Sequence, residues 1–160
     1  RSNHFLESYW QAGFDKSMLP SIRADFLEYF SNHDVPFYDG MKQLVNSFAI
    51  AILSHTSPVV IKAQLSRHGI MLPVFGGEDK KTACVECLRC IGQNSVFYIT
   101  DSPTDALTVS EAGKELNVNI RLIGVTWGLH TETEFNNCKN ILVVSSVEQL
   151  GSILHNNSVK

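Results

Sequence analysis

Hydrophobic positions after residue 48 follow two alternating patterns. Short runs of β-branched and aromatic residues are separated by longer segments in which apolar positions recur with helical spacing. Strands that are buried on both faces and alternate with amphipathic helices are typical of a parallel sheet covered on both sides. The sequence therefore predicts a doubly wound, Rossmann-like α/β fold. The expected strands are residues 48–53, 71–75, 95–100, 120–125 and 140–144, and the expected helices are residues 58–68, 81–91, 104–116 and 147–154.

The front of the chain has a different pattern. Residues 4–31 contain no strand signal and predict two helices, over residues 5–11 and 19–30, on either side of a break at Gly13. A turn and a short helix over residues 41–47 lead into the first strand. We find no linker-like stretch and no internal repeat, so we expect one domain. Its expected parts are a helical appendage or reduced cap over residues 1–35, an α/β core over residues 36–154 and a frayed polar tail over residues 155–160.

The composition narrows the classes of partner. Hydrophobic residues make up 44% of the chain and charged residues 18%, which is typical of a globular protein. The formal charge is -3. A net negative charge does not favour binding to nucleic acid or to an anionic membrane surface, so we expect neither as a partner. No run of 18 apolar residues occurs, so we expect no membrane insertion. The chain begins at Arg1 without an initiator Met, and we expect further residues upstream.

The four cysteines favour a reducing intracellular compartment, cytoplasm or organelle matrix. Cys84, Cys87 and Cys90 recur at spacing three within one predicted helix, which is too regular and too local for a disulfide framework. The same run resembles part of an iron–sulfur ligand set, whose fourth cysteine would stand near position 94, but that position is Asn94. We therefore interpret these cysteines as small apolar side chains of a helix.

Two aspartates follow the second long strand. Asp101 stands at the end of strand 95–100, and Asp105 stands one helical turn later. Ligands of open α/β sheets bind beyond the carboxyl ends of the strands, and two carboxylates there suit Mg²⁺. The alternative is that both aspartates only cap the helix that follows, for which Ser102 and Thr104 are also candidates.

Two further polar features follow the other strands. Ser54 ends strand 48–53, and its hydroxyl together with main-chain N–H groups of the next helix can bind a phosphate oxygen. Lys80 and Lys81 stand at a helix start, where a positive charge is unfavourable beside the helix dipole unless solvent or an anion compensates it. Each feature has an ordinary alternative interpretation. Ser54 could be a helix cap, and the lysines could be solvated surface residues. We expect a supporting or surface role for His55.

In this order, the hydroxyl of Ser54, the lysine pair and the Asp101-x-x-x-Asp105 motif resemble the second, third and fourth motifs of the haloacid-dehalogenase (HAD) superfamily. Residues 123–130 and 141–150 are similar to those of its phosphoglycolate-phosphatase-type members, and the resemblance covers about residues 36–154. It implies a HAD-type Mg²⁺-dependent phosphate-monoester hydrolase. Asp101 would be a metal ligand, and Asp105 would reach the metal directly or through water. Ser54 and one of Lys80 and Lys81 would bind the phosphoryl group.

The first motif of that family, Asp-x-Asp-Gly-Thr after a hydrophobic strand, does not occur in the sequence. Asp39-Gly40 follows Phe37-Tyr38 with no strand signal before it, so we do not assign Asp39 as the nucleophile. The alternative function is a catalytically inactive HAD-like subunit with a structural or assembly role. A sheet without its first-motif strand would expose edges, so we expect a protein partner or a missing N-terminal segment to complete it. A third class of function, with the same fold class, is a receiver- or flavodoxin-like binding module.

Overall fold

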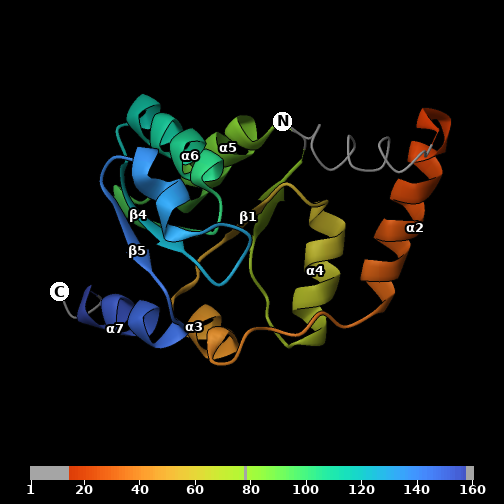
Figure 1. Cartoon of the computed structure of the whole chain (residues 1–160), viewed down its shortest axis with the longest axis horizontal. Coiled ribbons are helices and arrows are strands. Elements are labelled where there is room, and N and C mark those ends of the chain that lie inside the picture. Colours follow the sequence, from red (N-terminus) through yellow and green to blue (C-terminus); the bar gives the residue numbers. More distant parts are fainter. Residues whose placement is uncertain (1–14, 78, 158–160) are drawn as a thin grey trace.

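The computed structural model describes residues 15–77 and 79–157, and strands alternate with helices from residue 52 onward (Figure 1). The first predicted helix, residues 5–11, lies outside the described residues. In chain order the elements are η1 (Lys16–Met18), α2 (Leu19–Asn32), α3 (Met41–Phe48), β1 (Ile52–Ser54), α4 (Pro58–Arg67), β2 (Val74–Gly76), α5 (Lys80–Ile91), β3 (Ser95–Thr100), α6 (Pro103–Leu116), β4 (Asn119–Val125), η2 (Glu132–Asn137), β5 (Ile141–Val144) and α7 (Val147–Asn157).

All strand pairs of the described residues are parallel, as the sequence predicts, but they lie in two sheets. One sheet pairs β1 with β2, and the other has the order β3-β4-β5. The expectation that residues 48–53 and 95–100 belong to a single sheet is therefore wrong for this part of the chain. The reason is that no strand of the described residues lies between β1 and β3 to join their edges. The fold is mixed α/β with parallel sheets.

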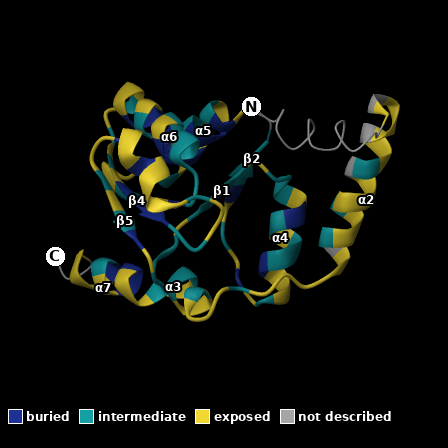
Figure 2. Ribbon diagram, viewed as in Figure 1, coloured by how far each residue is buried: buried dark blue, intermediate teal, exposed yellow. Residues whose placement is uncertain are grey.

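The three-stranded sheet is covered on both faces. Side chains alternate across a strand, so Ile123 and Val125 of β4 point to one face and Leu122 to the other. The first face packs against α7 through Leu150 and Leu154, with α3 beside it. The second face packs against α5, α6 and η2. The buried side chains of the two clusters on this face are Cys84, Leu88, Ala106, Val109, Ala112, Leu122, Phe135 and Cys138, the last of which directly follows η2. Figure 2 shows the buried residues around β4 and on the inward sides of these helices, whereas α2 is mostly exposed.

The two-stranded sheet is held between α4 and α5. Ile52 of β1 packs against the cluster of Leu65, Ile70 and Val74 on the α4 side. Leu53, the next residue, packs on the α5 side. The ends of β1 and β2 approach closely at Gly76, where a Cβ atom would lie 2.3 Å from the carbonyl oxygen of Ser54. Glycine is therefore required at this position by backbone contact.

Helix α5 carries the three closely spaced cysteines. Cys84 and Cys87 are buried, and desolvation raises the pKa of both thiols to about 11. Cys90 is exposed. The two buried thiols are core side chains, in agreement with their interpretation as small apolar residues. Within the described ranges, no group of three or more His, Cys, Asp or Glu side chains could hold a metal ion, and no helix is long and apolar enough to cross a membrane.

Three predicted boundaries are wrong. The strand predicted over residues 48–53 begins only at Ile52, because the amphipathic helix α3 continues to Phe48 and packs its apolar side against the α7 layer. The strand predicted over residues 71–75 is Val74–Gly76, and Met71 is 88% exposed. The frayed tail predicted from residue 155 is helical to Asn157, whose side-chain amide donates to the carbonyl of Ile153 at 2.8 Å.

Packing of α7 on the sheet gives a test of this core. Leu150 is fully buried, so truncation to alanine would leave a cavity, and we expect Leu150→Ala to lower the free energy of unfolding by about 2–5 kcal/mol. Leu129 is 89% exposed, and Leu129→Ala should change that free energy by less than about 0.5 kcal/mol. Urea denaturation followed by circular dichroism measures both. Equal effects of the two substitutions would contradict the packing described here.

Candidate functional site

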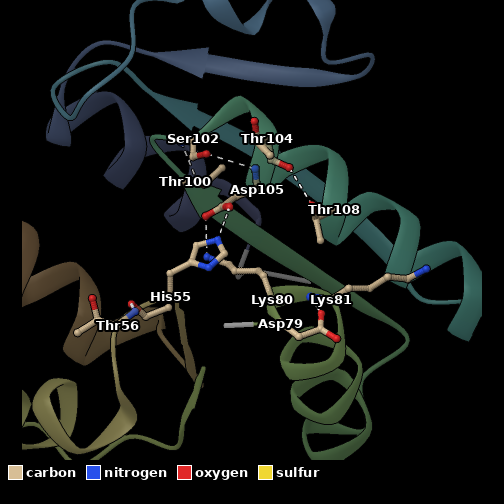
Figure 3. A network of polar contacts seen from close by, with 11 residues as sticks. His55, Thr56, Asp79, Lys80, Lys81, Thr100, Ser102, Thr104, Asp105 and Thr108 are labelled. Atoms are coloured by element: carbon tan, nitrogen blue, oxygen red, sulfur yellow. Dashed lines mark hydrogen bonds and ion pairs between the residues drawn. The ribbon is translucent and has the colours of Figure 1, made fainter. Parts of the chain in front are cut away.

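The carboxyl ends of β1 and β3 meet at one end of the molecule. β1 ends at Ser54 and is followed by His55, while β3 ends at Thr100 and is followed by Asp101. The first turns of α5 and α6 reach the same place, because each follows the end of a parallel strand. Figure 3 shows side chains from these four segments grouped around Asp105. This end of the sheets is the candidate site.

Asp105 holds the group together. Its Oδ2 accepts a hydrogen bond from the Lys80 ammonium at 2.6 Å, and its Oδ1 lies 3.2 Å from Nε2 of His55. Both side chains point toward the carboxylate in Figure 3. The side chain of Lys80 is 7% exposed and that of Asp105 is 13%, whereas His55 is 57% exposed. Lys80 and Asp105 therefore form a largely desolvated, charge-assisted pair, with the imidazole on its solvent side.

Lys80 and Lys81 have different surroundings. Asp79 caps α5 by accepting the backbone N–H groups of Lys81 and Thr82 at 3.0 and 3.1 Å, which fixes the start of the helix at Lys80. From there Lys80 reaches the Asp105 carboxylate. Lys81 instead pairs with Glu115 along the outer side of α6, where it is 45% exposed. The structure thus brings Lys80 to the candidate site and directs Lys81 away from it.

Ser54 does not act as the cap of the following helix. Helix α4 begins at Pro58, and its N-cap is Ser57. The hydroxyl oxygen of Ser54 instead accepts the backbone N–H of Thr56 at 3.0 Å, within the loop that leaves β1. This bond holds the hydroxyl at the strand end, beside His55.

Asp101 does not cap a helix either. Its Oδ2 accepts the backbone N–H of Leu129 at 3.2 Å, from the loop that follows β4. Gly128 lies so close that a Cβ atom there would be 2.3 Å from the same oxygen. The cap of α6 is Ser102, whose hydroxyl accepts the N–H of Asp105 at 3.3 Å. The two aspartates therefore have tertiary partners, and Asp105 also lies in the first turn of α6, where a carboxylate favours the helix dipole.

Tyr98 lies beneath the site on β3. Burial raises the pKa of its phenol, and the negative charge of Asp105 raises it further. The phenol is neutral as a result and adds no charge to the group. Sequence reasoning missed Asp79, Gly128 and the N–H of Leu129. Only Asp79 had a local signal, as an acidic residue just before a helix, since the other two reach Asp101 from a loop that is distant in sequence.

Asp39 lies apart from this group. It lines a hollow of about 300 Å³ together with Tyr38, Trp127, Ser145, Ser146, Val147 and Glu148. Its neighbours are the start of α7 and the loop after β4. The structure therefore does not place Asp39 among the side chains that surround Asp105.

The group combines an ammonium, a hydroxyl, an imidazole and two carboxylates at the end of parallel strands. Such a set can bind an oxyanion through Lys80 and Ser54 and a hard cation through Asp101. The chemistry it supports on its own is binding and charge stabilisation.

Comparison with known proteins does not assign the chain to a family. No protein-family model matches the sequence, and no curated protein matches it significantly. The resemblance to the HAD superfamily therefore depends on the motifs themselves.

Because only Lys80 belongs to the buried ion pair, we expect substitutions of Lys80 and Lys81 to change the free energy of unfolding by different amounts. Lys80→Met would leave the Asp105 carboxylate without its ammonium, and we expect a loss of about 3–5 kcal/mol in the free energy of unfolding. Lys81→Met removes only an exposed pair and should have no measurable effect. Chemical denaturation of both variants gives the comparison. Adding Asp105→Asn to Lys80→Met should restore most of the loss, and a double variant as unstable as the sum of its parts would contradict the assignment.

Proposed function

We propose that this chain carries the phosphate- and magnesium-binding part of a HAD-type, Mg²⁺-dependent phosphate-monoester hydrolase with a doubly wound α/β core. The observation that supports it most is the meeting of Lys80, Asp105 and His55 at the carboxyl ends of β1 and β3, the strands that Ser54 ends and Asp101 follows. The three motifs that carry the family resemblance come from separate segments, and Asp105 contacts both Lys80 and His55, the residue that follows Ser54. The proposed substrate is a phosphorylated molecule.

Lys80 and Ser54 are the proposed phosphate ligands. The ammonium would bind an equatorial oxygen and stabilise the charge that develops during phosphoryl transfer. The Ser54 hydroxyl accepts the N–H of Thr56 and keeps its own proton to donate to a second oxygen. Asp105 holds the ammonium in place, and Lys81 has no part in this assignment.

The donor set also fits a magnesium ion. Mg²⁺ in phosphate-binding sites is held by one or two carboxylates, with substrate phosphate and water as further ligands. Asp101 directly follows the end of β3, and it is the proposed direct ligand. Both oxygens of Asp105 are engaged by Lys80 and His55, which favours contact through water. When bound, the ion would neutralise negative charge on the phosphoryl group.

The attacking carboxylate is the missing part of this proposal. Covalent phosphoryl transfer in the resembled family uses the first aspartate of Asp-x-Asp-Gly-Thr, and the 160 residues contain no such motif. The alternative is a catalytically inactive subunit with a structural role, which this missing motif favours. In either case the local, helical spacing of Cys84, Cys87 and Cys90 favours a reducing intracellular compartment.

Turnover of p-nitrophenyl phosphate tests the function. The 160 residues alone should show no Mg²⁺-dependent hydrolysis, whereas a version extended upstream by a strand and an Asp-x-Asp loop should be active. In the extended version, Ser54→Ala should lower kcat/KM roughly tenfold through one lost charge-assisted hydrogen bond. Lys81→Ala should leave kcat/KM unchanged. An extended protein that stays inert while folded would favour the inactive-subunit alternative, and turnover by the 160 residues would refute the missing-nucleophile assignment.

Magnesium binding tests the role of Asp101 separately. Asp101→Asn replaces a charged ligand with a neutral one, so isothermal titration of the extended version should show Mg²⁺ affinity reduced at least tenfold. Asp79→Asn is the matched control, because asparagine caps helices as well as aspartate does and Asp79 lies outside the proposed metal site. Equal affinities in the wild type and Asp101→Asn would exclude Asp101 as a ligand.

A further inference from the structure

An apolar hollow of about 360 Å³ lies between α2 and α4, which run side by side in Figure 1. Phe26 and Phe30 line it from α2, and Val60 and Ile61 line it from α4. Residues 35–37, in the segment that leaves α2, line it as well. The hollow is thus bounded by three separate segments of the chain.

Polar groups around the hollow bond to one another. Both side-chain N–H groups of Gln64 donate to carbonyls, one of Phe30 and one of His33. The amide oxygen of Gln64 accepts the N–H of Val35 at 3.0 Å, and Nε2 of His68 donates to the carbonyl of Val35 at 3.0 Å. Because these groups already have partners, a ligand in the hollow would gain little from polar groups of its own and would lose the hydration of any charge. The surroundings therefore favour an uncharged, apolar ligand.

The same bonds hold the hollow open. Gln64 and His68 are one helical turn apart at the end of α4, and both attach the chain that leaves α2 to this helix. Arg67, between them, pairs with Asp34 at 3.5 Å. With α2 attached in this way, Phe26 lines the apolar hollow and is still 42% exposed. A ligand would therefore bury apolar surface in a cavity that is already formed, which lowers the cost of binding.

Aromatic rings lie on more than one side of the hollow. The rings of Phe26 and Phe30 are tilted by 39° with their centroids 4.4 Å apart. From the segment after α2, Phe37 meets the ring of His68 edge to face at 4.9 Å. Rings in such arrangements offer faces and edges to a further ring, and these contacts contribute beyond the area that they bury. This composition favours an aromatic ligand.

The volume indicates the size of the ligand. A dry apolar cavity of about 150 Å³ holds one benzene ring, so a hollow of about 360 Å³ has room for about two fused rings. One turn of an α-helix with its side chains, about 10 Å wide and about 5.4 Å long, already occupies about 400 Å³. An extended peptide would bring backbone N–H and C=O groups that need partners, and the polar groups around the hollow are engaged. A small molecule therefore fits this hollow better than a protein segment does.

We propose that the hollow between α2 and α4 binds a small, uncharged aromatic molecule with about two fused rings. The rings would lie between the phenyl groups of α2 and the apolar side chains of α4. Thr56 also lines the hollow, and its N–H bonds the hydroxyl of Ser54, so the ligand would lie next to the loop that leaves β1. This inference depends on the hollow and does not require the proposed hydrolase activity.

Titration of the 160 residues with naphthalene, followed by NMR of methyl groups, tests the binding. The methyl resonances of Val60, Ile61 and Leu65 should shift saturably, with a dissociation constant on the order of 0.1 mM. Those of Ile123, in the core of the β3–β5 sheet, should not move. Naphthalene-1,5-disulfonate has the same rings with a charge at each end, so one charge would have to enter the hollow. It should bind at least about tenfold more weakly.

Two exposed aromatic residues of α2 give a matched pair of variants. Phe26 lines the hollow, whereas Tyr29 lies outside its lining and is 55% exposed. Phe26→Ala should weaken naphthalene binding about fivefold or more, and Tyr29→Ala should change it by less than about twofold. In a second pair, Ile61→Trp would fill the hollow and should abolish binding, while Val59→Trp, at a position that is 72% exposed, should preserve it.

Unchanged resonances of Ile123 in each variant show that the core is still folded. The absence of a saturable shift in the wild type, equal affinity for the disulfonate, or equal effects of Phe26→Ala and Tyr29→Ala would each overturn the proposal. Shifts of the Val60 and Ile61 methyl groups that appear without ligand, on raising the protein concentration, would identify a second copy of the chain as the occupant. That result would overturn the proposal as well.

Discussion

The Asp105 carboxylate is the contact on which the two halves of this structure depend. The described strands form two sheets with no ladder between them, so they are connected by helix packing and by side chains. Asp105 belongs to the half containing β3–β5 and binds Lys80 and His55, which belong to the segments around β1 and β2. Because Lys80 is almost fully desolvated, loss of this partner would leave a buried positive charge unpaired, which is strongly destabilising.

The same contact explains the position of the candidate site. An ammonium at the first residue of a helix is disfavoured by the helix dipole, and the cap by Asp79 and the pair with Asp105 compensate for it. The result is a cation held in a defined place at the strand ends, with Ser54 and Asp101 near it. Asp101 is fixed in turn by the loop at Gly128, which only a glycine allows. This fixed cation is the basis of the phosphate-binding role proposed for the site.

The site and the open strand edges are two aspects of one arrangement. Both lie where β1 and β3 face each other, and the functional groups come from the loops that leave these strands.

Local patterns in the sequence determined most of the secondary structure. The helices that begin near Pro58 and Pro103, the strand 95–100 and the parallel α/β class follow from periodicity, proline and glycine, because these act over a few residues. The strand ends also made Ser54, Asp101 and Asp105 candidate site residues, since polar residues at the carboxyl ends of parallel strands face a common edge. The buried cysteines of α5 were equally readable from their spacing.

Tertiary structure decided what depends on contacts between distant segments. Lys80 and Lys81 are neighbours with identical side chains, and only the positions of α5 and α6 direct one to Asp105 and the other to Glu115. The same holds for Gly128 beside Asp101 and for α3, whose packing on the α7 layer kept residue 48 helical. The division of the strands into two sheets also needed the structure, because strand pairing is set by which edges meet in space. The residue pattern within a single strand does not show which other strands it pairs with.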